Sequence, residues 1–246
     1  MGRHALRASD GAGGQGQLNA RVAAWAIHLL TASSAVLALL ALAAIEQGRW
    51  RDALLWLLAA LVVDGVDGTL ARAMRVSERL PNVDGTALDL VVDYLTYVFV
   101  PACFLWRIGA FPPPLALPLV SLILISSLYT FVRRDMKAED GYFRGFPALW
   151  NIVALYAFVA GPPPWVAAGV AALLIVMTFA PIHVVHPFRV RDYRDWLPVT
   201  AILWAVATLA LLLPLSQILL GAALAVSLGC CAILLTMGLI RSLRGQ

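Results

Sequence analysis

Residues 53–73 read ALLWLLAALVVDGVDGTLARA, and residues 84–93 read DGTALDLVVD. The first stretch begins as an apolar run and then carries Asp64 and Asp67, and the second carries Asp89 and Asp93 where another apolar run begins. A charged side chain inside a bilayer costs at least about 2.5–3.5 kcal/mol. Four acids within apolar runs therefore indicate a membrane protein with a charged site inside it.

The composition of the whole chain agrees with this interpretation. Of its 246 residues, 61% are hydrophobic and 13% are charged, whereas an average soluble domain is about 45–50% apolar and about one quarter charged. A soluble fold of this length has too little interior for so much apolar surface, so lipid must surround much of the chain. The net charge of +4 is modest and the basic residues lie between apolar runs, so we expect no nucleic-acid partner.

Eight apolar segments are long enough, or nearly so, to cross a hydrocarbon core of about 30 Å. They are Val22–Ile45, Ala53–Ala73, Leu88–Ile108, Leu115–Val132, Pro147–Ala160, Trp165–Val184, Leu197–Leu213 and Gln217–Ile240. Backbone groups in lipid need hydrogen bonds within their own segment, so we expect helices. The predicted fold class is all-α, a polytopic integral membrane protein with about eight transmembrane helices.

The distribution of charge predicts the orientation. If the N-terminus is cytoplasmic, the cytoplasmic loops contain most of the basic residues, namely Arg3, Arg7, Arg21, Arg72, Arg75, Arg79, Arg133, Arg134, Lys137, Arg144, Arg189, Arg191, Arg194, Arg241 and Arg244. The opposite loops contain Arg49, Arg51 and Arg107. Because basic loops stay inside, both termini are expected to be cytoplasmic. The polar, glycine-rich residues 1–20 are expected to form a flexible tail before a single transmembrane domain, residues 21–246.

The spacing of the four acids predicts a metal site. Asp64 and Asp67 are three residues apart and Asp89 and Asp93 are four apart, so each pair shares one helix face. The connecting loop makes the two helices antiparallel, which brings the carboxylates together. Hard divalent cations with oxygen ligands, Mg²⁺ or Mn²⁺, relieve the repulsion between them and attract phosphate oxygens.

The residues around the acids suit a phosphate-bearing ligand. Gly68 and Gly85 let a ligand or helix approach the backbone, and Arg72 can hold a phosphate through two hydrogen bonds. Two other interpretations remain open from these residues alone. The acids could pair with Arg72, Arg75 and Arg79 as helix-end salt bridges, or they could mark the cation pathway of a transporter. The sequence has no zinc-type Cys/His spacing, no Walker loop and no nucleophile elbow.

The string Asp64-x2-Asp67-Gly68-x2-Ala71-Arg72, followed by Gly85-x3-Asp89-x3-Asp93, resembles the signature of the CDP-alcohol phosphotransferase family. Residues 73–84 make the spacing between its two halves longer than is usual in the family, and similar to that of the bacterial phosphatidylcholine synthases. Further runs are also similar to that group, namely residues 28–33, 93–101, 145–147 with 150–151, and 186–191.

This resemblance implies an enzyme that transfers the phosphatidyl group of CDP-diacylglycerol to choline, giving phosphatidylcholine and CMP. It implies a multi-pass protein of the bacterial inner (cytoplasmic) membrane that forms a homodimer. Two ions of Mn²⁺ or Mg²⁺ would be held by Asp64, Asp67, Asp89 and Asp93. Asp93 would also be the catalytic base that takes the choline proton. The CDP site would be shaped by Gly68, Ala71, Arg72 and Gly85.

Choline recognition is expected from aromatic rings or a carboxylate, because a quaternary ammonium has no hydrogen-bond donor at nitrogen. Tyr94, Tyr97 and Trp150 are the candidates, since they lie next to the motif or on a segment that enters from the same side. Taken singly, each is more often a packing or interfacial aromatic in a membrane protein. Two alternatives for the function remain: another acceptor alcohol (serine, glycerol phosphate or inositol phosphate), or, outside the family, a cation-coupled transporter.

Overall fold

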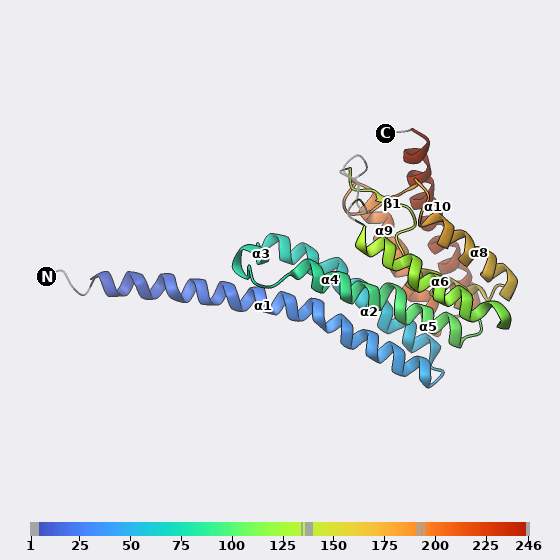
Figure 1. Cartoon of the computed structure of the whole chain (residues 1–246), viewed down its shortest axis with the longest axis horizontal. Helices are drawn as coiled ribbons and strands as arrows, with labels where there is room; N and C mark the ends of the chain where they lie inside the picture. Colours follow the sequence, from blue (N-terminus) through green and yellow to red (C-terminus); the bar gives the residue numbers. More distant parts are fainter. Residues whose placement is uncertain (1–4, 134, 136–139, 191–192, 194, 245–246) are drawn as a thin grey trace.

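The structure, a computed structural model, describes residues 5–133, 135, 140–190, 193 and 195–244 and is mostly helical (Figure 1). Its helices are α1 (Ala5–Glu46), α2 (Trp50–Ala73), α3 (Val76–Arg79), α4 (Gly85–Asp93), α5 (Val100–Arg107), α6 (Pro113–Val132), α7 (Trp150–Ala160), α8 (Pro164–Met177), α9 (Leu197–Leu212) and α10 (Gln217–Leu243). A π-helix, η1 (Tyr94–Phe99), joins α4 to α5. Two short antiparallel strands, β1 (Phe143–Arg144) and β2 (His183–Val184), pair with each other.

Five helical segments of the described chain are long and apolar enough to cross a membrane. They are Gln15–Glu46, Trp50–Ala73, Gly85–Arg107, Pro113–Val132 and Gln217–Leu243. The apolar helices α7, α8 and α9 have 11, 14 and 16 residues, or about 16–24 Å at 1.5 Å per residue, which is shorter than a core of about 30 Å. The expected all-α membrane protein is therefore confirmed, and eight crossings with cytoplasmic termini stay a prediction.

Two of the expected segments are shorter in the structure. The segment expected at Trp165–Val184 ends as α8 at Met177, and its last two residues form β2 instead. Pro181 in the connection has no backbone N–H and cannot continue a helix. The segment expected at Pro147–Ala160 begins as α7 only at Trp150, because a turn with positive φ at Gly145 and Ala148 comes first.

The N-terminal helix is longer than expected. Residues 5–20, expected as a flexible tail, continue α1 as a helix that extends beyond the other helices (Figure 1). The division of the chain at residue 20 into a tail and a catalytic domain stays a prediction. Five basic residues of the charge argument lie outside the described residues, namely Arg3, Arg134, Lys137, Arg191 and Arg194.

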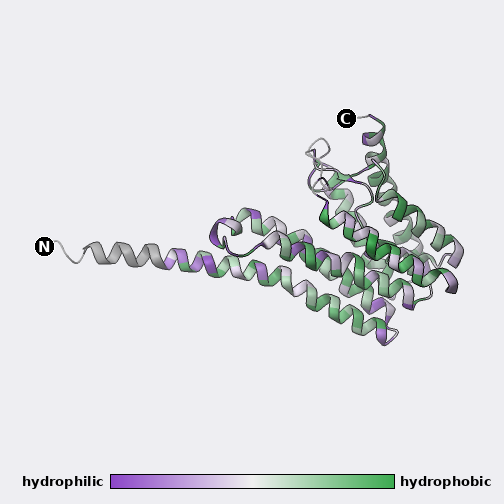
Figure 2. Cartoon of the chain, in the orientation of Figure 1, coloured by the Kyte–Doolittle hydropathy of each residue, from purple (hydrophilic) through white to green (hydrophobic). Residues whose placement is uncertain are grey.

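The packing of α1 on α2 positions the first pair of acids. Ala38, Ala41 and Ala44 of α1 and Ala53 of α2 are all at most 4% exposed. Small residues of this kind let helix backbones approach closely in a membrane. α4 packs against α1, and η1 contacts both α1 and α2. Figure 2 shows hydrophobic residues along most helices and a hydrophilic region around α3, next to the ends of α2 and α4.

Two ion pairs involve described residues between α6 and α7. The Arg133 guanidinium donates to both carboxylate oxygens of Asp135, with Nε–Oδ1 2.8 Å and Nη2–Oδ2 2.7 Å. Arg241, near the end of α10, donates to Asp140 with Nε–Oδ2 2.7 Å. The two strands lie beside the same end of α10, where the Ser242 hydroxyl accepts from the backbone N–H of β2 at 2.7 Å.

Candidate active site

Three of the four aspartates lie together. One carboxylate oxygen from each of Asp64, Asp89 and Asp93 lies within 4.8 Å of the other two. Asp64 comes from α2, and the other two come from successive turns of α4, where a four-residue spacing places them on one face. All three side chains are partly exposed. The structure therefore brings a triad of carboxylates from two helices to one place.

Asp67 lies apart from this cluster. It is only 3% exposed, and the Thr31 hydroxyl of α1 contacts its carboxylate. Three residues along an α-helix turn a side chain by about 300°, so Asp67 is offset from Asp64 by about 60° around α2. That offset turns Asp67 toward α1, while Asp64 faces α4.

Tyr97 is tied to the acid cluster. Its hydroxyl donates a hydrogen bond to Asp64 Oδ2 at 2.7 Å, and the side chain is only 7% exposed. The residue belongs to η1, the π-helix that starts directly after Asp93. A charge-assisted hydrogen bond of this length fixes the orientation of a carboxylate and leaves its other oxygen for a cation. This residue was expected to contact choline, and the structure gives its hydroxyl a contact with an acid.

The other two expected choline residues pack against α6. The Tyr94 hydroxyl donates to the Leu124 carbonyl at 3.1 Å, and its ring meets Phe131 edge-on with centroids 5.8 Å apart. Trp150 is completely buried, and its indole N–H donates to Ser127 Oγ at 2.9 Å. The three partners share one face of α6. Both aromatics have packing roles in the structure, and contact with choline stays a prediction for each.

The expected CDP residues of α2 lie near its end. Arg72 folds back along the helix, with Nη2 donating to Thr69 Oγ1 at 3.3 Å. A Cβ atom on Gly68 would lie 3.4 Å from Nη1 of the same guanidinium, so glycine leaves room for it. Ala71 packs on the apolar contact between α1 and α3. The structure thus gives the Arg72 guanidinium a polar neighbour on its own helix, Thr69.

The fourth expected CDP residue, Gly85, begins α4 and lies against α1. A Cβ atom there would be 2.7 Å from Cε1 of His28, so the imidazole packs directly on the glycine. His28, Thr31 and Ser34 are all at most 8% exposed. Among the described residues, His28 Nε2 and Ser34 Oγ are buried with no hydrogen-bond partner. Buried polar atoms usually have partners, so these two atoms are suited to a polar ligand. In the sequence, His28, Thr31 and Ser34 are recognisable as polar residues that recur every three positions within an apolar run.

The donor set of the cluster fits a divalent cation. Its ligands are three carboxylates from two helices, and hard oxygen donors of this kind suit Mg²⁺ and Mn²⁺. A negatively charged cluster in a membrane protein also needs compensation by positive charge.

Comparison with known proteins gives consistent matches. The CDP-alcohol phosphatidyltransferase family matches residues 25–179. A Pseudomonas aeruginosa protein named phosphatidylcholine synthase is 46% identical over 185 residues, which cover 75% of this chain and 78% of that protein. A protein of the same name from Bradyrhizobium diazoefficiens is 45% identical over 192 residues (77% and 71%). One from Borreliella burgdorferi is 33% identical over 182 residues (74% and 78%). The family match includes α2, α4 and η1, and α9 and α10 lie beyond it.

Proposed function

The chain belongs to the CDP-alcohol phosphatidyltransferase family, and on this basis we propose that it is a membrane-bound phosphatidylcholine synthase. It transfers the phosphatidyl group of CDP-diacylglycerol to choline, giving phosphatidylcholine and CMP. The observation that carries the proposal is the carboxylate cluster of Asp64, Asp89 and Asp93 between two apolar helices. The names of relatives that are 33–46% identical support choline as the acceptor. Family membership decides against the cation-coupled transporter.

Two divalent cations, Mn²⁺ or Mg²⁺, are proposed for this site. The cluster of three acids would hold the first, and Asp67, one turn further along α2, would contribute to the second. When bound, such ions neutralise a pyrophosphate and stabilise the attacking and leaving oxygens of an in-line displacement. The hydrogen bond from Tyr97 holds Asp64 in one orientation, which keeps the cluster ready for a cation.

Asp93 is proposed as the general base. The choline oxygen forms a bond to the phosphorus of the phosphatidyl group, the bond from that phosphorus to CMP breaks, and the hydroxyl proton goes to the Asp93 carboxylate. This proposal is supported by the place of Asp93 in the cluster, one helical turn beyond Asp89. Asp93→Asn is therefore expected to bind CDP-diacylglycerol and to lose turnover. Near-normal turnover in this variant contradicts the role.

Substrate contacts form a further part of the proposal. Gly68, Ala71, Arg72 and Gly85 would surround the CDP group, with the guanidinium turned from Thr69 toward phosphate. Tyr94, Tyr97 and Trp150 remain the proposed aromatic contacts of choline. If Trp150 contacts choline, Trp150→Ala raises the KM for choline more than it raises the KM for CDP-diacylglycerol. Equal effects on both KM values identify a packing residue, in keeping with its burial and its bond to Ser127.

Localisation and assembly are proposed from the charge pattern and the family. The protein would cross the bacterial inner membrane eight times, with both termini in the cytoplasm, and would form a homodimer. Reporter fusions after Gly109 and at the C-terminus are expected to give opposite locations. Light scattering of the purified protein is expected to give twice the mass of the 26.5 kDa chain. A measured mass equal to that of one chain would contradict the proposed homodimer.

An acceptor assay tests the proposed reaction. Purified protein in detergent micelles receives CDP-dioleoylglycerol and Mn²⁺, and choline, serine, inositol phosphate or glycerol phosphate is offered separately. We expect CMP and phosphatidylcholine with choline alone, and neither product with Asp89→Asn. Release of CMP with another alcohol keeps the acid cluster and corrects the acceptor. Folded protein that releases no CMP with any acceptor contradicts the proposal.

A further inference from the structure

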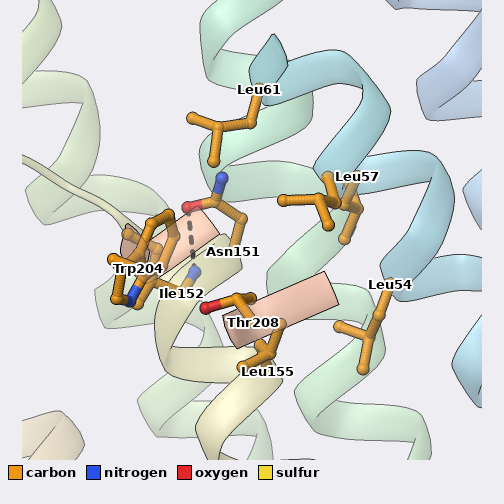
Figure 3. A pocket seen from close by; sticks show the side chains of 9 residues that line it. Leu54, Leu57, Leu61, Asn151, Ile152, Leu155, Trp204 and Thr208 are labelled. Atoms are coloured by element: carbon orange, nitrogen blue, oxygen red, sulfur yellow. Dashed lines mark hydrogen bonds between the residues drawn. The ribbon is translucent and has the colours of Figure 1, made fainter. Parts of the chain in front are cut away.

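Asp67 lies in the contact between α1 and α2. On α2, Ala53, Ala60 and Asp67 recur every seven residues, and all three are at most 3% exposed. Seven residues are close to two helical turns, so these side chains share the face of α2 that packs along α1. Another side of α2 carries Leu57 and Leu61, which line a small gap toward α7 and α9 (Figure 3). Asp67 is about 120° around the helix from Leu61 and points away from that gap.

Thr31 is a polar residue in the matching face of α1. Ala24, Thr31 and Ala38 also recur every seven residues, and they are at most 8% exposed. Alanines in such a contact let two helix backbones approach closely, so the short side chain of Thr31 reaches the Asp67 carboxylate. The Thr31 hydroxyl has a single proton, and its other acceptor is the Ile27 carbonyl of its own helix, at 3.3 Å. A carboxylate is the stronger acceptor of the two.

No basic side chain compensates the charge of Asp67. None of the ion pairs in the described part of the chain includes Asp67, and the charged group that acts on it is Asp64, another acid. A carboxylate buried without a positive partner is costly. A neutral hydroxyl can orient such a carboxylate but does not balance its charge, which a divalent cation would do. The arrangement therefore suits a cation ligand that α1 holds in place.

We propose that Thr31 is a positioning residue for the second divalent cation, and that it acts by holding the Asp67 carboxylate in one orientation. The inference rests on the proposed function, in which Asp67 is a ligand of that cation. One Asp67 oxygen accepts the Thr31 proton, which leaves the other oxygen for the cation. Tyr97 acts on Asp64 in the same way. α1 thus contributes to the cation site although it carries none of the four aspartates.

Thr31→Val tests the proposal, because valine keeps the shape of the side chain and removes the hydroxyl. Bound Mn²⁺ is measured by electron paramagnetic resonance as the protein is titrated without lipid. We expect the wild type to bind two ions, and Thr31→Val to keep the first while its affinity for the second falls by about 10–100-fold. Thr31→Ser, which keeps the hydroxyl, should restore the second affinity. Ser33→Ala is the matched control, because the Ser33 hydroxyl lies on the same helix and donates to the Leu30 carbonyl of α1.

A double variant distinguishes positioning of Asp67 from a general effect on the fold. In Asp67→Asn the second ion is already lost, so the addition of Thr31→Val should leave the Mn²⁺ titration unchanged. A further loss in the double variant, an unchanged second affinity in Thr31→Val, or an equal loss in Ser33→Ala overturns the inference. Thr31→Ala serves the same test if Thr31→Val does not fold.

The same titration separates this inference from the proposed reaction. A wild type that binds a single ion overturns the role of Thr31 and leaves the reaction standing, because choline-dependent CMP release is measured separately. A wild type that binds two ions, with the second weakened in Thr31→Val, supports the inference even if no CMP is released, and the missing CMP then contradicts only the reaction.

Discussion

Removal of one hydroxyl, in Tyr97→Phe, is expected to weaken cation binding at the acid cluster. The substitution keeps the buried ring and deletes the 2.7 Å hydrogen bond to Asp64 Oδ2. A hydrogen bond to a charged group contributes about 1.5–3 kcal/mol, which corresponds to a factor of roughly 10–100 in affinity at about 1.4 kcal/mol per tenfold. Loss of partners that orient metal ligands has effects of the same size, about 10–100-fold.

The assay for Tyr97→Phe measures Mn²⁺ affinity directly. Free Mn²⁺ is followed by electron paramagnetic resonance as protein is titrated without lipid, and the Mn²⁺ concentration for half-maximal CMP release is measured separately. Tyr94→Phe is the matched control, because Tyr94 lies on the same π-helix and its hydroxyl bonds to the Leu124 carbonyl on α6. Unchanged Mn²⁺ affinity in Tyr97→Phe, or an equal loss in Tyr94→Phe, would refute the reasoning. Because phenylalanine keeps the aromatic face, the KM for choline should change less than the Mn²⁺ affinity.

Two further substitutions follow from local geometry. Gly85→Ala places a Cβ atom 2.7 Å from His28 Cε1, and overpacking of this kind costs about 1–3 kcal/mol. We therefore expect a lower midpoint of thermal unfolding and weaker CDP-diacylglycerol binding. Wild-type values for both would show that the imidazole moves freely. The hydrogen bond from Arg133 lowers the pKa of Asp135 to about 2, so its stabilising effect is present above the unfolded pKa and is lost as the pH falls from about 4 to about 2. The difference in unfolding midpoint between wild type and Asp135→Asn should therefore be constant from neutral pH to about pH 4 and then disappear; a difference that grows with acid contradicts the assignment.

The sequence was sufficient to predict that the long apolar segments are helical and that the two acids of α4 share one face. Apolar runs of membrane length must be helical for backbone reasons alone, and a four-residue spacing keeps Asp89 and Asp93 on one face whatever the neighbouring helices do. Their meeting with Asp64 followed from the short connection between α2 and α4. These predictions rest on local geometry, which sequence spacing determines.

Other features depend on packing between distant segments. Asp67 turns toward Thr31, because the rotation of α2 is set by its contact with α1, which spacing does not encode. The hydrogen bond between Tyr97 and Asp64 joins residues 33 positions apart and requires η1. The residue types at 94–99 do not predict a π-helix. The early end of α8 had a sequence signal in Pro181, but the continuous apolar run concealed it.

The π-helix also sets how the two ends of one long helical segment are rotated relative to each other. α4, η1 and α5 together run from Gly85 to Arg107, with the acids on the first part and the fully buried Phe104 and Leu105 on the last. The wider turns of η1 determine how these two faces are rotated relative to each other. Deletion of one residue within 94–99 would rotate one face by about 100° relative to the other. The segment would still be helical and long enough to span the membrane. It could not, however, place its acids next to α2 and bury Phe104 and Leu105 in the bundle at the same time. The number of residues in 94–99 is therefore constrained, even at positions where the side chain is not.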